Sequence, residues 1–409
     1  MNTLAPSFTG ATAEVTIERS VRRRIGVIWA LLFFSVLTYS AGLPMLITIP
    51  STVGKVMTQG ALWVALLLAL TLNRRIVIRP NAFLLIFTLL AALSLLSSVR
   101  TFHLGSTYRA VRLIGFLATL WLLTPWWGRK DMLLLRCQLR CLVVVIFAAA
   151  AGIVISPHKA LQSGRLYGII WPIYTTQLAH YAAVAAGLGA VLWLCGLISR
   201  NRALLLEGFS VLVLLLTHTR TALVAMLAAI TVAALSLFFG RRRVRRVVAV
   251  SLAIAAVVAV AFLPTLVHWF QRGETGTSFT DLSGRTLVWH QLLNFPRSKP
   301  QELFGFGLSN TSFQGFSIDD SWLAIYQDQG LVGDILVGLL LLALWVSAIT
   351  RPRGPSRALV LFILTYCVIA SYTEVGLGDA STYILDLAVA ASLLAPPAWS
   401  RPLERAPAS

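Results

Sequence analysis

Charged residues are scarce in this sequence, and acidic residues are the scarcest of them. Only 12% of the 409 residues are charged, while 57% are hydrophobic. A soluble domain carries about a quarter charged residues. Fifteen Asp and Glu stand against 34 Lys and Arg, which gives a net charge of +19. Together with a mean hydropathy of +0.80, this composition excludes an ordinary soluble domain and predicts a polytopic membrane protein.

Motifs for metals, nucleotides and disulfides are also missing. The four cysteines form neither a disulfide framework nor a CxxC metal pair. The six histidines show no i, i+4 pair with an acidic neighbour, and there is no EF-hand pattern, Walker loop or Rossmann loop. We therefore expect no metal, no cofactor and no nucleotide-sugar donor.

The excess of Lys and Arg is explained by membrane topology better than by nucleic-acid binding, because basic residues cluster between apolar runs as they do in cytoplasmic loops. Twelve apolar runs are long enough to cross a hydrocarbon core of about 30 Å as helices. They lie at 25–49, 54–72, 82–98, 111–126, 133–156, 175–198, 203–217, 219–239, 247–266, 323–349, 358–372 and 382–397. The boundary between the seventh and eighth runs is marked only by HTRT at 218–221.

The placement of Lys and Arg predicts the orientation of these spans. Most of them fall on one side if the N-terminus is cytoplasmic, so the positive-inside rule places both termini in the cytoplasm. The first run is too long for a signal-peptide core, and we expect it to remain as a span. The expected domains are a cytoplasmic tail at 1–24, spans one to nine in 25–266, an extracytoplasmic loop at 267–322, spans ten to twelve in 323–397, and a cytoplasmic tail at 398–409.

Several arginines lie at the outer ends of spans, against this charge bias. They are Arg100, Arg109, Arg112, Arg165, Arg220 and Arg285. Anionic partners would explain them, since a guanidinium is a planar fork of donors suited to phosphate oxygens. Snorkelling to lipid phosphates is the alternative. That alternative is weaker for Arg220, which lies with His218 between two spans that have almost no loop.

The segment 267–322 is the only long polar stretch and contains the remaining candidates. Arg285 precedes TLVWHQLL, which has helical spacing, with Trp289 available to pack on a membrane or sugar face. Further on, Gly305 and Gly307 predict a tight backbone path.

Two adjacent carboxylates, Asp319 and Asp320, open an amphipathic helix that leads into the next span. One of them can cap that helix, and either is a candidate general base for a hydroxyl.

These elements occur in an order that resembles a known family. SGRxxxW at 283–289, FGxGxSN at 304–310 and QGLVG at 329–333 follow GRLYG at Arg165 and TRT at Arg220. With twelve spans, the set is similar to the O-antigen ligase and O-antigen polymerase family of bacterial envelope enzymes, and the resemblance covers most of the chain.

The resemblance implies an all-α, GT-C-like fold that moves a glycan from a polyprenyl diphosphate carrier to an acceptor hydroxyl on the outer side of the bacterial cytoplasmic membrane. By similarity, Arg220 and Arg285 would bind the carrier diphosphate, assisted by Arg165. Asp319 or Asp320 would take the acceptor proton. Secondary site candidates are His218, Trp289 and Tyr326.

Ligases of this family usually have His-Asn where this chain has Asp319-Asp320. Polymerisation of lipid-linked repeat units is therefore the preferred function, and transfer of a finished polysaccharide to a lipid, protein or wall acceptor is the alternative.

A transporter or flippase of the same lipid is an alternative of another class, and it predicts charged helices near the membrane midplane, for which Asp386 and Glu207 are the only hints. Expected partners are the lipid-linked donor, a glycan or lipid acceptor and membrane lipids, with the oligomeric state left open.

Overall fold

The computed structural model describes residues 8–37, 39–40, 42–100, 104–238, 243–247, 249–250, 285–309 and 312–397. Its elements are α1 (Phe8–Val36), α2 (Ser51–Leu72), α3 (Ala82–Arg100), α4 (Leu104–Leu123), η1 (Thr124–Trp126), α5 (Leu133–Ile155), α6 (Pro157–Ala160), β1 (Leu161–Gln162), β2 (Arg165–Leu166), α7 (Thr175–Leu194), α8 (Arg200–Thr217), α9 (Arg220–Phe238), α12 (Arg285–Leu293), α13 (Lys299–Phe304), β3 (Ser312–Phe313), β4 (Phe316–Ser317), α14 (Ser321–Thr350), α15 (Pro355–Ala370) and α16 (Thr382–Leu394). Within these ranges the named strands form only two short antiparallel hairpins. The predicted all-α fold is confirmed for the described part of the chain.

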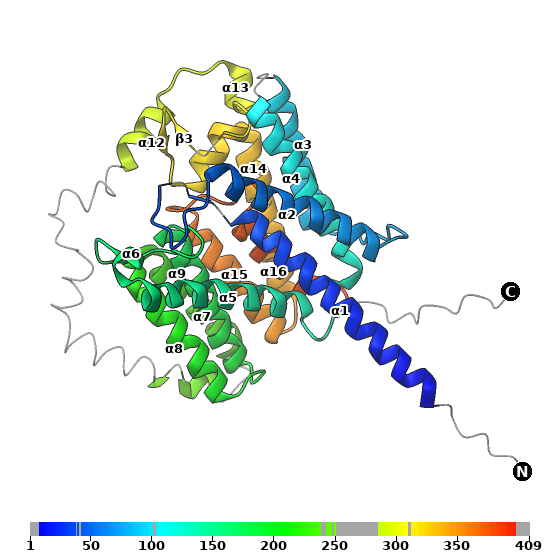
Figure 1. Cartoon of the computed structure of the whole chain (residues 1–409). Helices are drawn as coiled ribbons and strands as arrows, with labels where there is room; N and C mark the ends of the chain where they lie inside the picture. Colours follow the sequence, from blue (N-terminus) through cyan, green and yellow to red (C-terminus); the bar gives the residue numbers. More distant parts are fainter. Residues whose placement is uncertain are drawn as a thin grey trace, which may run out of the picture.

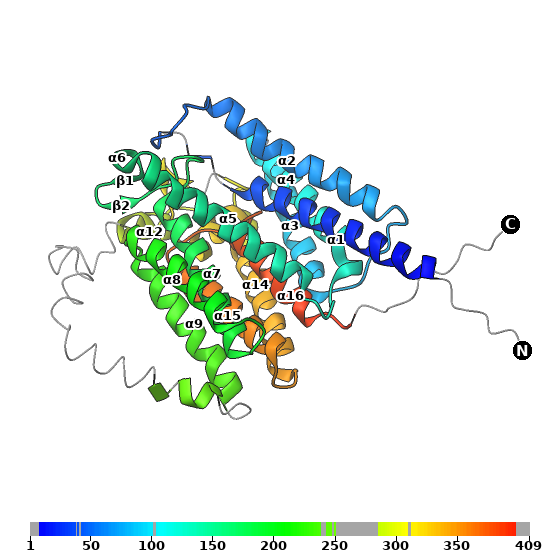
Figure 2. The ribbon, with the colours of Figure 1, turned by 60° about the horizontal axis from the view of Figure 1, so that its bottom comes forward.

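The helices form one bundle in which α7, α15 and α16 bury most of their side chains. Figures 1 and 2 show α1 to α4 on one side, α7 to α9 on the other, and α14 to α16 between them, while α5 packs on both α1 and α7. The packing of α3 on α14 and of α9 on α15 connects these groups. A helix that is apolar all round is stable only when other helices or lipid cover it, so this arrangement explains why the last helices of the chain lie at the centre.

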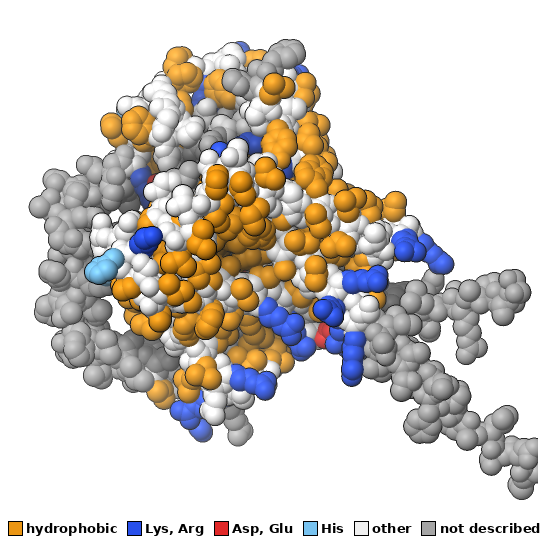
Figure 3. Space-filling view, viewed as in Figure 1, with side chains coloured by type: hydrophobic (Ala, Val, Ile, Leu, Met, Phe, Trp, Pro, Cys, Tyr) orange, Lys and Arg blue, Asp and Glu red, His pale blue; other side chains and the backbone are white. Residues whose placement is uncertain are grey.

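Six helices of the described chain are long and apolar enough to cross a membrane, namely α2, α3, α5, α7, α9 and α14, while α15 and α16 are apolar but shorter. Each predicted span outside 247–266 overlaps a helix, and 247–266 falls almost wholly outside the described residues. A broad hydrophobic surface covers the face in Figure 3, with Lys and Arg gathered along its lower edge. These features fit a polytopic membrane protein, and the count of twelve spans stays a prediction.

The first predicted span, 25–49, is helical only in its first half, and to that extent the prediction is wrong. Helix α1 ends at Val36, and the described residues between it and α2 form no helix. Gly42 has a left-handed φ of +95°, and Pro44 and Pro50 follow. Because proline lacks the backbone N–H that helix hydrogen bonds require, hydropathy alone overestimated the length of this helix.

The boundary predicted at HTRT is confirmed. Helix α8 ends at Thr217, His218 adopts a left-handed conformation with φ of +52°, and α9 begins at Arg220. A left-handed residue after the last helical turn is a common helix stop. The apolar run from 203 to 239 is therefore two helices joined by a tight turn, and this turn places Arg220 at a helix start.

The segment after α13 is docked into a break in α14. Gly330 has a left-handed φ of +68° and interrupts the helix, which leaves the carbonyls of Gln327 and Asp328 available. They accept the backbone N–H groups of Phe306 at 3.0 Å and Gly307 at 2.8 Å. The tight path predicted at the two glycines is thus confirmed, and it fixes the polar segment to the helix that follows it.

A chain of buried polar side chains crosses the bundle core. Trp29 Nε1 donates to Gln138 Oε1 at 2.9 Å, and Gln138 Nε2 donates to Asp386 Oδ1 at 2.7 Å. The second carboxylate oxygen lies 3.1 Å from His180 Nε2. These four residues come from α1, α5, α16 and α7, so one hydrogen-bonded network joins helices from the two ends of the chain.

Candidate functional site

Helix α12 holds the stretch that leads into α14 through two side chains. Arg285 Nε lies 3.3 Å from Asp319 Oδ2, and Trp289 Nε1 donates to the backbone carbonyl of Ile318 at 2.8 Å. Residues four apart share one face of a helix, so α12 presents both groups to the same segment. The structure therefore brings together Arg285 and Asp319, two of the predicted site residues, and it gives Trp289 a positioning contact.

Asp319 is held in an unusual backbone conformation. Its φ of +45° is left-handed, a region that few residues other than glycine adopt but that Asp tolerates. The hydroxyl of Ser317 donates to its Oδ1 atom. The side chain is 39% exposed, so this carboxylate is accessible while it is paired with Arg285.

Asp320 is the N-cap of α14. Its Oδ1 accepts the backbone N–H of Leu323 at 2.8 Å, and the residue is only 5% exposed. Burial raises the pKa of this carboxyl, while hydrogen bonds from the backbone of Leu323 and Trp322 and the charge of Arg285 oppose the rise. Of the two adjacent carboxylates, Asp320 therefore performs the capping and Asp319 faces the site.

Glu374 is a third carboxyl at this site, and the sequence analysis did not single it out. It lies between α15 and α16, in a loop tied to the first residue of α14. The hydroxyl of Ser321 donates to the Glu374 carbonyl at 2.7 Å and accepts the backbone N–H of Gly376 at 3.0 Å. An acidic residue in a short polar gap between two apolar helices was the signal that could have found it, although Asp379 in the same gap carries the same signal.

Charged side chains from three other segments of the chain change the pKa of Glu374. Burial raises its pKa to about 7; the charge of Asp319 also raises it, whereas Arg285, Arg165 and a hydrogen bond from Thr176 lower it. A carboxyl with this pKa changes its ionisation near neutral pH. It follows that Glu374, Asp319 and two of the predicted arginines act on one another electrostatically.

Arg165 lies in a short hairpin that contacts the turn before Arg220. Arg165, in β2, follows a tight turn at Gly164 with φ of +72°, and its Nε donates to the carbonyl of Thr217 at 3.3 Å. Arg220 is the first residue of α9, three residues after Thr217, and it is half-buried. The three predicted arginines thus come from three separate elements, with Arg165 linked both to the α8–α9 turn and to Glu374.

Two secondary candidates have structural roles in the described chain. The ring of Tyr326 lies under the Arg297 guanidinium, 4.3 Å from the ring centroid, and Arg297 also donates to Gln327 Oε1 at 2.8 Å. His218 forms the left-handed turn between α8 and α9. Tyr326 therefore supports the polar segment, and His218 shapes the turn that carries Arg220.

Two other arginines with predicted outward positions contact the polar segment. Arg109 donates to the backbone carbonyl of Ser309, and the Arg100 guanidinium lies 5.8 Å from the centroid of the Phe304 ring. These contacts supply a reason for both residues without a bound anion. They separate Arg100 and Arg109 from Arg285 and Arg165, whose charges lower the pKa of Glu374.

The arrangement combines cations with carboxylates of different character. Arg285 and Arg165 can neutralise an anion such as a diphosphate, Asp320 is committed to a helix cap, and Glu374 can exchange a proton near pH 7. In the described part of the chain, no group of three or more His, Cys, Asp and Glu side chains is placed to hold a metal ion. Metal-independent chemistry stays a prediction.

Part of this site lies in a segment that matches a known protein family. Residues 205–333 match the family model described as O-antigen ligase, and this range contains Arg220, Arg285 and the two aspartates, whereas Arg165 and Glu374 lie outside it. No curated protein matches the chain. The match confirms, for segment 205–333, the resemblance to this family seen in the sequence.

Proposed function

We propose that this protein is a bacterial inner-membrane glycosyltransferase that moves a glycan from a polyprenyl diphosphate carrier to an acceptor hydroxyl on the outer side of the membrane. We further propose that it polymerises lipid-linked repeat units. The observation that carries the proposal is the Arg285–Asp319 pair beside Glu374 and Arg165, in a chain whose segment 205–333 matches the O-antigen ligase family.

In this reaction the acceptor oxygen attacks the anomeric carbon and forms the new glycosidic bond. The bond from that carbon to the carrier diphosphate breaks, and the diphosphate leaves with the electron pair. Arg285, Arg220 and Arg165 stabilise the charge that grows on it, an effect worth about 3 kcal/mol for one well-placed donor. Polyprenyl diphosphate is a stable anion, so the mechanism needs no metal, and inversion at the anomeric carbon is expected.

The acceptor proton passes to a carboxylate, and the three candidates differ in their environments. Asp320 is buried as a helix cap, and Asp319 is paired with Arg285. Glu374 has a pKa of about 7, which is the value that serves a general base best near neutral pH. We therefore propose Glu374 as the base, with Asp319 orienting Arg285, and we keep Asp319 in the test as the competing base.

The test is reconstitution of the purified protein in vesicles with undecaprenyl-diphosphate-linked repeat units, followed by sizing of the products. Wild-type protein should give a ladder of glycan lengths. Replacing Arg285 with Ala should lower the transfer rate about 100-fold, since one electrostatic donor is lost. The matched control is Arg100→Ala, which removes a guanidinium that contacts Phe304 and should keep the ladder.

The description of the matching family favours a second candidate, ligation of a finished polysaccharide to another acceptor. A ligase would give no ladder from repeat units alone, and would transfer a preformed long chain once to an added lipid acceptor. Movement of intact lipid-linked glycan across the vesicle membrane without any new glycosidic bond would contradict both and would indicate a flippase.

A further inference from the structure

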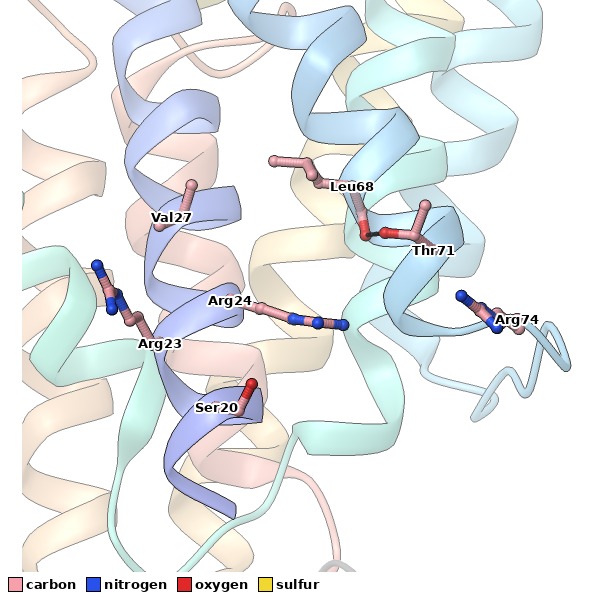
Figure 4. Close-up of a pocket in the computed structure, with 7 residues that line it drawn as sticks. All are labelled: Ser20, Arg23, Arg24, Val27, Leu68, Thr71 and Arg74. Atoms are coloured by element: carbon pink, nitrogen blue, oxygen red, sulfur yellow. Dashed lines mark hydrogen bonds between the residues drawn. The ribbon is translucent and has the colours of Figure 1, made fainter. Parts of the chain in front are cut away.

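A cavity of about 550 Å³ opens between the middle of α1 and the end of α2. Three arginines line it, Arg23 and Arg24 from α1 and Arg74 from the residues after α2, together with the hydroxyls of Ser20 and Thr71. In Figure 4 the side chain of Arg24 extends from α1 toward α2, where Thr71 and Arg74 stand. Positive charge from two separate elements therefore faces one opening.

The arginines of this cavity differ from their neighbour Arg22 in charge compensation. Arg22 lies 2.9 Å from Glu18 and 3.3 Å from Asp131. Within the described ranges, no acidic side chain forms a salt bridge with any of the three cavity arginines. Among the side chains that the structure describes, the three cavity arginines thus have no acidic partner whereas Arg22 has two, and an anion would complete the cavity.

Two apolar side chains also line this cavity. Val27 is 46% exposed and Leu68 is 36% exposed, and both line the opening. In Figure 4 they lie together on one side of Arg24. A ligand that fits has anionic phosphate at one end and hydrocarbon at the other, which is the chemistry of a phospholipid.

We propose that this cavity is a binding site for an anionic phospholipid, whose phosphate contacts Arg24 and Arg74 and whose acyl chain lies against Val27 and Leu68. Guanidinium groups bind phosphate oxygens by paired hydrogen bonds, and basic pockets between helices on the cytoplasmic side bind such head groups. The positive-inside rule assigns this arginine-rich end to the cytoplasmic leaflet. The site is at the opposite end of α1 and α2 from α12 and α13 (Figure 1), so it is separate from the proposed transfer site.

The experiment uses the full-length protein purified in mild detergent and native mass spectrometry with added cardiolipin, phosphatidylglycerol or phosphatidylcholine. Wild-type protein should retain cardiolipin or phosphatidylglycerol about tenfold better than phosphatidylcholine, as expected for about 1.4 kcal/mol of selectivity. The double variant Arg24→Ala, Arg74→Ala should lose that preference. Arg75→Ala is the matched control, because Arg75 is an exposed neighbour outside the cavity lining, and it should keep the preference.

Two outcomes would overturn the proposal. The first is equal retention of the three lipids by the wild-type protein. The second is an equal loss of the preference for anionic lipid in the double variant and in Arg75→Ala. A parallel titration with inorganic phosphate distinguishes the source of the anion, since displacement of the lipid by millimolar phosphate would assign the cavity to a free phosphate instead.

Discussion

The ionisation of the Glu374 carboxyl depends on the charges around it. This single residue therefore gives a prediction for how the transfer rate changes with pH. A base must be deprotonated, and burial raises the pKa of Glu374 to about 7. The transfer rate of wild-type protein should therefore rise about tenfold per pH unit below pH 7 and level off above it. Rates of the reconstituted enzyme between pH 5.5 and 8.5 measure this directly. Glu374→Gln should lower the rate strongly and remove the inflection.

Asp319 supplies the matched variant for that experiment. Its negative charge raises the pKa of Glu374, so Asp319→Asn should move the inflection to lower pH. If Asp319→Asn instead abolishes transfer while Glu374→Gln retains the wild-type profile, the base is Asp319. Separating these roles needs the structure, because nothing in the linear sequence places Glu374 beside the aspartate.

At the scale of one element, the break in α14 depends on a single glycine. Gly330 has a φ of +68°, and a Cβ atom there would lie 2.5 Å from the carbonyl carbon of Leu303. Gly330→Ala should destabilise the protein on the order of 2 kcal/mol or more, because the left-handed conformation and the clash both oppose a side chain. Thermal unfolding in detergent, followed by circular dichroism, measures the effect.

Gly338 lies on the same helix and is the control for this substitution. No atom lies within 4 Å of the position of its Cβ, so Gly338→Ala should be neutral or stabilise α14 by up to about 1 kcal/mol through helix propensity. An unfolding temperature lowered equally by both substitutions would show that the break in α14 is not what Gly330 provides.

The network of Trp29, Gln138, His180 and Asp386 gives a prediction at the scale of the whole molecule, since it joins four helices. Asp386→Ala would leave buried His180 and Gln138 without their acceptor, and breaking such a buried pair is destabilising on the order of 3 kcal/mol or more. The unfolding temperature in detergent should fall by several degrees. Ser392→Ala is the control on α16, because the Ser392 hydroxyl bonds only a carbonyl of its own helix at 2.7 Å, and it should change stability little.

The predicted orientation of the protein in the membrane is a property of the whole molecule, and it can be tested by cysteine labelling. Lys299, in α13, and Arg75, after α2, are both exposed and are predicted to lie on opposite sides of the membrane. In a variant without the four native cysteines, Lys299→Cys should react with a membrane-impermeant maleimide in intact bacterial cells with a permeabilised outer membrane. Arg75→Cys should react only after the cytoplasmic membrane is opened. Labelling of Arg75→Cys in intact cells would contradict the predicted orientation.

Much of this protein follows from its sequence. Apolar runs separated by basic loops predicted a helical membrane protein, because lipid admits a single span only if its backbone hydrogen bonds are internal. HTRT predicted the turn before Arg220, and SGRxxxW with QGLVG indicated the family that residues 205–333 match. These features are local, and each is set by a few neighbouring residues.

The tertiary structure decided what depends on distance through space. It assigned the helix cap to Asp320 and the Arg285 contact to Asp319, and it brought Glu374 to them from a loop after α15. It also ended α1 at Val36, before the apolar run ended. Hydropathy sums over a window and cannot register one left-handed residue, and the pKa of a carboxyl depends on which remote charges the fold places around it.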